Sequence, residues 1–237
     1  MTEIIIKVIA SMLLGTLAGF SAVYIFNKMP ASWLCDYGET PSAELADPHI
    51  QRVKGYPWRW IYAAAFSCLL VRLTFFDVQF AAAGLFACWA LLIIGLADLK
   101  YMIIPDQFVI MLALSAFGFI PFHEGLWQPA YGAAIGGGVM LLAALLGGAA
   151  FKKEVMGFGD VKLFASLGLC LGAKGTVIVL IGAALCSGIA AVVGLARGKY
   201  KRTDVKPLGP YICAWGMIYI FVFWPLFGSQ GFLFVSP

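Results

Sequence analysis

Long apolar segments separated by short polar breaks run through almost the whole chain. A helix needs about 20 apolar residues to cross the hydrocarbon core of a bilayer, and most of these segments approach that length. Eight segments are predicted to be spans, at approximately 4–27, 58–76, 79–97, 104–122, 129–150, 161–173, 174–196 and 209–231. The sixth is short, and its boundary with the seventh falls between Gly172 and Gly175, so the pattern fits either seven or eight spans.

The composition is that of a chain embedded in lipid. Of the 237 residues, 62% are hydrophobic and only 12% are charged, which differs strongly from the composition of soluble domains. The six cysteines stand singly, without a Cys-x-x-Cys pair, so neither a disulfide framework nor a four-thiolate zinc site is indicated. We therefore predict an all-α, polytopic membrane protein with about eight transmembrane helices.

The positions of the basic residues predict the orientation of the spans. If the N-terminus lies outside the cytoplasm, 13 of the 16 lysines and arginines fall on the cytoplasmic side. They are Lys28, Arg52, Lys54, Arg59, Lys100, Lys152, Lys153, Lys162, Arg197, Lys199, Lys201, Arg202 and Lys206. Only Lys7, Arg72 and Lys174 fall outside, so the positive-inside rule favours this orientation, with both termini extracytoplasmic. The basic run at 197–202 is then a determinant of topology, although it also fits docking of an acidic partner or lipid headgroups.

The chain is predicted to have three parts. Residues 1–27 form the first transmembrane helix, 28–57 a short cytoplasmic loop, and 58–237 a seven-helix membrane region. The first apolar run is too long for a signal peptide and lacks a small-residue cleavage site before Lys28, so we expect this span to be retained. The loop is too short to form a core of its own. The glycines between Gly132 and Gly148 predict close packing of helices in lipid.

Ionisable residues at the cytoplasmic ends of apolar spans are the candidates for chemistry, because such groups are costly in a membrane. Asp98 and Asp160 occupy matching frames, Gly-x-x-Asp-(Leu or Val)-Lys, 62 residues apart. Two carboxyl groups in a partly dry site share a proton and titrate as a unit. This suits aspartyl proteolysis, in which one carboxylate takes a proton from water while the other donates to the scissile carbonyl. We expect Asp98 and Asp160 to be catalytic, with activity that depends on pH.

Several neighbours of these aspartates are expected to bind substrate or support the site. Glycines beside Asp160 allow the backbone to approach an extended substrate strand. Asp106 follows Pro105 and is also typical of a helix start, which favours a structural role for it. The supporting residues are predicted to be Gly157, Gly159, Asp106, Lys100 and Lys162. Alternatively, Asp98 and Asp160 only cap helices or pair with the lysines two residues after them.

Three stretches of sequence follow one another in a specific order. They are 98–106 (DLKYMIIPD), 156–163 (MGFGDVKL) and 207–211 (PLGPY). Together they resemble the type IV prepilin peptidases, a branch of the GxGD aspartyl proteases to which presenilin-type enzymes also belong. The resemblance covers residues from about 80 to 215 and implies that Asp98 and Asp160 are the catalytic pair, with Asp106 a nearby polar residue of lesser standing.

The resemblance implies an enzyme of the bacterial plasma membrane whose site faces the cytoplasm. Its substrates would be type IV prepilins or pseudopilins, which it would cleave after a glycine to remove a short basic leader. No cofactor is needed for that cleavage, no nucleic acid is expected as a partner, and membrane lipid surrounds the chain. The oligomeric state stays open.

Methylation of the new N-terminus is a second activity of many family members. They use S-adenosylmethionine and a larger cytoplasmic loop with two Cys-x-x-Cys zinc pairs. Here the 28–57 loop holds only Cys35, so that zinc site is not formed, and methylation with S-adenosylmethionine stays an open possibility. Cys35, Asp36 and His49 lack the spacing of metal ligands, and we predict no metal site.

Two other classes of function also fit an apolar chain of this kind. A proton- or cation-coupled transporter uses intramembrane aspartates, but it predicts acidic residues near the midplane rather than at the cytoplasmic ends of spans. A non-catalytic scaffold for an assembly machine would tolerate replacement of both aspartates. The positions of Asp98 and Asp160 favour the peptidase.

Overall fold

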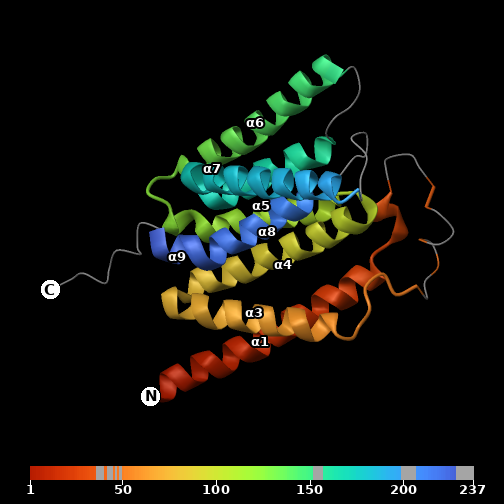
Figure 1. Cartoon of the computed structure of the whole chain (residues 1–237). Helices are drawn as coiled ribbons and strands as arrows, with labels where there is room; N and C mark the ends of the chain where they lie inside the picture. Colours follow the sequence, from red (N-terminus) through yellow and green to blue (C-terminus); the bar gives the residue numbers. More distant parts are fainter. Residues whose placement is uncertain are drawn as a thin grey trace.

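Apolar runs of this length form helices because every backbone polar group in lipid must be hydrogen-bonded within its own segment. The computed structural model of the protein describes residues 1–35, 40–41, 45, 47, 50–151, 157–198 and 207–227, with the side chains at 150, 151 and 227 excepted. Over these residues it contains helices and no strand (Figure 1). The elements are α1 (Thr2–Lys28), η1 (Ala31–Leu34), α3 (Trp58–Phe76), α4 (Val78–Tyr101), α5 (Asp106–Phe119), η2 (Ile120–Phe122), α6 (Gln128–Phe151), α7 (Phe158–Ala196), α8 (Gly209–Ile218), η3 (Tyr219–Phe223) and α9 (Trp224–Phe227).

Six stretches of helix among the described residues are long and apolar enough to cross a membrane, and Asp106–Phe122 is a shorter apolar stretch. The prediction of an all-α, polytopic membrane protein is therefore confirmed. The orientation of the spans and the placement of the termini stay predictions.

The long helix α7 contains a break that matches the predicted boundary between the sixth and seventh spans. Its 39 residues would extend about 58 Å, roughly twice the thickness of the hydrocarbon core. Gly172 has φ 69° and ψ −179°, a backbone region open essentially to glycine alone. Beyond this break, Gly175 lies against Tyr219 and Gly182 against Trp215, so the second half of α7 runs antiparallel to α8.

The ends of the helices near the aspartates differ from the predicted ones. The apolar run before Asp98 ends at residue 97, but α4 continues to Tyr101 and buries Asp98 in its last turns. α7 begins at Phe158, so Asp160 lies within its first turn rather than before the helix. The difference arises because a hydropathy pattern stops at the first charge, whereas helical hydrogen bonds continue past it. The predicted residues 228–231 of the last span lie outside the described residues.

The helix α4 occupies the centre of the bundle and lies between α3 and α8 in Figure 1. At the end opposite Asp98, an aromatic cluster fixes the neighbouring helices, with the ring of Phe80 5.3 Å from Phe119 and 5.2 Å from Trp224. On the other side of the bundle, α6 packs closely on α7. A Cβ atom on Gly132 would collide with the carbonyl oxygen of Gly168, so the predicted close packing at the glycine-rich stretch is confirmed.

The described parts of the 28–57 loop are anchored at the end of the bundle that holds Asp98. The guanidinium of Arg52 is buried and donates to the carbonyl oxygens of Phe26, at 3.0 Å, and Met29, at 2.5 Å. These carbonyls belong to the C-terminal end of α1, where no intrahelical partner is available. Lys100 Nζ donates to the carbonyl oxygen of Arg52. The loop therefore connects the end of α1 to the end of α4.

Candidate active site

Asp98 is held near the C-terminal end of α4 and faces the start of α8. Asp98 is 5% exposed. Its backbone carbonyl oxygen accepts a 2.9 Å hydrogen bond from the backbone N–H of Met102. Met102 has the left-handed conformation, with φ 55°, and ends α4. The carboxyl group lies against the backbone amide of Gly209. A Cβ atom on residue 209 would lie 2.5 Å from Oδ2 of Asp98, so only glycine allows this close approach.

Asp160 is held in the first turn of α7 by a glycine-rich entry. Gly157 is the N-cap residue, with extended backbone, and its carbonyl oxygen accepts a 3.2 Å hydrogen bond from the Asp160 N–H. A Cβ atom on Gly159 would lie 3.2 Å from Cβ of Ile104, in the link between α4 and α5. At Gly157 the nearest atom would be 3.9 Å away. The entry is therefore packed at Gly159 and open at Gly157.

The two carboxyl groups are brought within electrostatic reach of each other, and both act on the buried thiol of Cys213 on α8. Oδ2 of Asp98 and Oδ1 of Asp160 are buried and have no hydrogen-bond partner among the described residues. Leaving one buried polar atom unpaired costs about 1–3 kcal/mol, and native proteins rarely do so. Two such oxygens on neighbouring carboxyl groups indicate a site that binds a polar group.

The predicted supporting residues divide into two sets of contacts. Both carboxylate oxygens of Asp106 accept hydrogen bonds from Lys162 Nζ, at 2.7 and 2.9 Å. Asp106 is also the first residue of α5, as its position after Pro105 predicted. Lys100, in contrast, holds the loop through Arg52. Each lysine thus has a partner other than the aspartate two residues before it, contrary to the alternative in which Asp98 and Asp160 mainly serve as ion-pair partners for these lysines.

The sequence did not predict some of the residues that lie at the site. Gly209 was noted only as part of the 207–211 stretch, and Ile104 and Cys213 were not singled out. The one usable signal was the Gly-Pro pair at the start of the last span, which points to Gly209. It places a residue without a side chain at the beginning of a helix. The positions of Gly209 and Cys213 depend on how α8 packs against α4, and that of Ile104 on how the link after α4 packs against α7. These tertiary contacts cannot be read from a single sequence.

The described residues contain no group of three or more His, Cys, Asp or Glu that could hold a metal ion. Cys35 lies after η1, where its Sγ donates to the carbonyl oxygen of Ala31 at 3.1 Å. The other two residues considered for a metal site, Asp36 and His49, lie outside the described residues, as do Lys152, Lys153 and the basic residues at 199–206.

The fold and the buried carboxyl pair define the class as a polytopic membrane protein with a candidate acid–base site. Residues 85–192 match the type IV leader peptidase family. This range contains Asp98, Asp106 and Asp160. The chain is therefore similar to this family over 108 of its 237 residues.

Several relatives of the chain are named prepilin leader peptidase/N-methyltransferase. The prepilin leader peptidase/N-methyltransferase of Xanthomonas campestris is 30% identical over 172 residues, which are 70% of this chain and 52% of the relative. That of Aeromonas salmonicida is 34% identical over 143 residues, 57% of this chain and 47% of the relative. That of Pectobacterium carotovorum is 29% identical over 187 residues, 68% and 66% of the two chains. The chain thus spans about half the length of the first two. No solved structure matches the chain.

Proposed function

We propose that the protein is a prepilin leader peptidase, an aspartyl endopeptidase that removes the leader of type IV prepilins or pseudopilins, with Asp98 and Asp160 as its catalytic pair. The observation that carries the proposal is the pair of buried carboxylate oxygens on α4 and α7 that have no hydrogen-bond partner in the described part of the chain. The relatives' names, which include prepilin leader peptidase, support the same substrate class.

The reaction follows from two carboxyl groups that share one proton. The ionised carboxyl takes a proton from a water molecule, whose oxygen attacks the scissile carbonyl carbon, while the protonated carboxyl donates to the carbonyl oxygen. The tetrahedral intermediate then breaks at the C–N bond, and a carboxyl group returns a proton to the leaving amine. The unhindered backbone at Gly157 offers an extended peptide access to Asp160.

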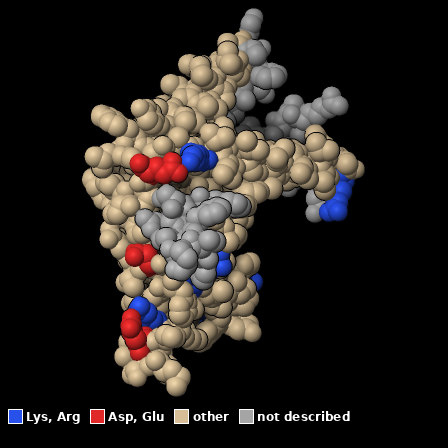
Figure 2. All heavy atoms as spheres, turned by 90° about the vertical axis from the view of Figure 1, so that its left-hand side faces the viewer, with Lys and Arg blue, Asp and Glu red and all other residues tan. Residues whose placement is uncertain are grey.

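We further propose that the site faces the cytoplasm of a bacterial plasma membrane. At the opposite end of the bundle, where α1 begins, the described residues show small, separate groups of charged side chains (Figure 2). Two of these groups are the ion pairs Glu3–Lys7, at 2.8 Å, and Glu124–Lys174, at 2.9 Å. The end with Asp98 holds Arg52, Lys100 and Lys162, as the positive-inside rule expects of a cytoplasmic side.

The test is to mix the detergent-solubilised protein with a prepilin from the same genome and S-adenosylmethionine, and to measure the intact mass of the product. We expect the mass of the mature pilin, cut after the leader glycine. An added methyl mass would assign the second activity that the relatives' names include, whereas its absence would restrict the short-loop protein to cleavage. Unchanged prepilin in the presence of folded protein would contradict the proposal and favour a transporter or a scaffold.

A further inference from the structure

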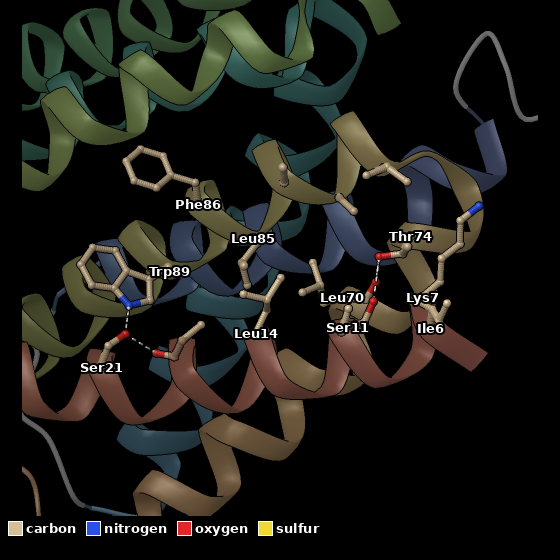
Figure 3. A pocket seen from close by; sticks show the side chains of 15 residues that line it. Ile6, Lys7, Ser11, Leu14, Ser21, Leu70, Thr74, Leu85, Phe86 and Trp89 are labelled. Atoms are coloured by element: carbon tan, nitrogen blue, oxygen red, sulfur yellow. Dashed lines mark hydrogen bonds between the residues drawn. The ribbon is translucent and has the colours of Figure 1, made fainter. Parts of the chain in front are cut away.

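A groove opens between α1 and α4 on the outside of the bundle, with α3 at its floor. Its volume is about 460 Å³, and its walls are mostly apolar, formed by Ala10 and Leu14 of α1 and Ala82, Leu85 and Phe86 of α4, among others. Figure 3 shows Ile6 and Lys7 at one end of the groove and Ser21 and Trp89 at the other. It is a hollow on the outside of the bundle that the described residues do not fill.

The position and length of the groove favour a lipid as its occupant. From Lys7 to Ser21 it follows α1 for about 21 Å, at 1.5 Å per residue. This length lies within the roughly 30 Å thickness of the hydrocarbon core, where lipid chains are the solvent of an apolar surface. An extended hydrocarbon chain therefore fits the groove.

The polar side chains in the walls are already paired with one another. The hydroxyl groups of Ser11 and Thr74 are 3.0 Å apart and hydrogen-bonded, and the indole N–H of Trp89 donates to Ser21 Oγ at 3.1 Å. Since these groups satisfy each other across the helices, the interior of the groove offers an occupant mainly apolar contacts. This again fits a hydrocarbon chain.

Opposite charges mark the outer end of the groove. Lys7 lines it, and Glu3 lies one helical turn earlier, with 2.8 Å between Lys7 Nζ and Glu3 Oε1. Both side chains are exposed, and an exposed ion pair of this kind is only weakly stabilising. A headgroup with one phosphate and one ammonium is complementary to both charges, because the phosphate accepts from Lys7 while the ammonium donates to Glu3.

We propose that this groove is a binding site for an aminophospholipid of the phosphatidylethanolamine type. One acyl chain lies between α1 and α4, and the headgroup binds at Glu3 and Lys7. The site is separate from the aspartates, since Asp98 follows Trp89 by nine residues, two and a half helical turns, and so points away from the groove. The proposal does not depend on the peptidase activity.

Native mass spectrometry of the purified protein, titrated with phosphatidylethanolamine or phosphatidylcholine, tests the site. Wild type should bind one phosphatidylethanolamine roughly fivefold more tightly than phosphatidylcholine, whose quaternary ammonium has no N–H to donate. Glu3→Gln should abolish that preference. Ala82→Trp should weaken binding by about tenfold, because the indole fills the groove.

Matched variants keep the test decisive. Ala143→Trp, at an exposed position of α6, is the same change outside the groove and should bind lipid as wild type does. Ala10→Trp fills the groove from the opposite wall and serves if Ala82→Trp fails to fold. Equal affinity of wild type and both groove variants, or equal affinity for the two lipids, would overturn the proposal. So would a wild-type dimer that Ala82→Trp dissociates, since a second copy would then occupy the groove.

Discussion

Asp98 lies against the backbone at the start of α8. Its carboxyl group lies against the amide of Gly209, and the first turn of α8 leaves no room for a Cβ atom there. The amide groups at a helix start favour a nearby carboxylate, so α8 contributes to the electrostatics of Asp98 without a charged residue of its own. The geometry of the proposed catalytic pair therefore depends on a residue without any functional group.

Replacing Gly209 by Ala should lower the rate of prepilin cleavage by roughly ten- to hundredfold, because the new methyl group displaces the Asp98 carboxyl from its place. Initial rates and the thermal midpoint of unfolding are both measured. Gly138→Ala is the control, since a Cβ atom on Gly138 meets nothing within 4 Å and alanine is favoured in a helix by about 1 kcal/mol. Equal cleavage rates for the two variants would contradict this role of Gly209.

His123 lies just beyond η2 and joins the break in α7 to the rest of the bundle. Its Nε2 is 3.1 Å from the carbonyl oxygen of Cys170, and its ring packs 5.1 Å from that of Trp224. A Cβ atom on Gly172 would lie 3.0 Å from the imidazole. Burial lowers the pKa of His123 from its ordinary value of 6.5, and the contact with the Cys170 carbonyl opposes that shift.

The stability of the protein should therefore fall in acid partly through His123. The unfolded chain protonates this histidine more readily than the folded one, so its contribution is complete above pH 6.5 and is lost as the pH falls below that value. Between about pH 7.5 and 5.5, the thermal midpoint of wild type should fall further than that of His123→Gln, which keeps a donor but does not titrate. Parallel pH profiles would exclude the effect.

The sequence could predict the residues of the site better than their contacts. Asp98 and Asp160 stood out because charges at the ends of apolar runs are costly. Gly209 and Ile104 did not, since a glycine and an aliphatic residue have no distinctive chemistry until the fold places a carboxyl or another helix beside them. His123 likewise gave no signal that it would lie half-buried beside a helix break.

At the scale of helices, the ion pair between Asp106 and Lys162 joins the start of α5 to the start of α7. Asp106 follows α4 after a short link, and Lys162 lies half a turn beyond Asp160. The pair therefore connects the two segments that carry the proposed catalytic residues. The two side chains are 33% and 30% exposed, so solvent partly screens the attraction between their charges.

A double-mutant cycle of Asp106→Asn and Lys162→Gln should give a coupling of about 0.5–1 kcal/mol in stability, which is the range of partly exposed pairs. The rates should show the same pattern, because either change alone removes the same ion pair between α5 and α7. The double variant should therefore cleave no more slowly than the worse single variant. Chemical unfolding and initial cleavage rates supply the data. Fully additive losses in both would show that the pair does not act as a unit.

The hydropathy pattern located the helices but not their ends or irregular turns. α4 ends where Met102 takes the left-handed conformation, four residues after the apolar run stops, and no residue type announces that turn. The π-helical turn η3 was also not predicted. Within it, the carbonyl oxygen of Phe221 accepts a 2.7 Å hydrogen bond from Arg72 Nε, which assigns a structural contact to a basic residue predicted to lie outside the cytoplasm.

Over the whole molecule, the two ends of the bundle differ in chemistry. The end with Asp98 holds the carboxyl pair, the anchored loop and the ion pair of α5 and α7, whereas the opposite end holds aromatic packing, His123 and the mouth of the proposed lipid groove. Reactions on a leader peptide and contacts with lipid would thus occur in different parts of one fold.

The proposed catalytic pair is tested most directly by comparing prepilin cleavage by Asp98→Asn, Asp160→Asn and wild type. The intact mass of the product is measured over time. Both variants should keep the fold, since asparagine has nearly the shape of aspartate, and their thermal midpoints are measured to establish this. Each should cleave about 1,000-fold more slowly than wild type, because each removes one of the two groups that move protons. Wild-type rates in either folded variant would contradict the proposed catalytic pair.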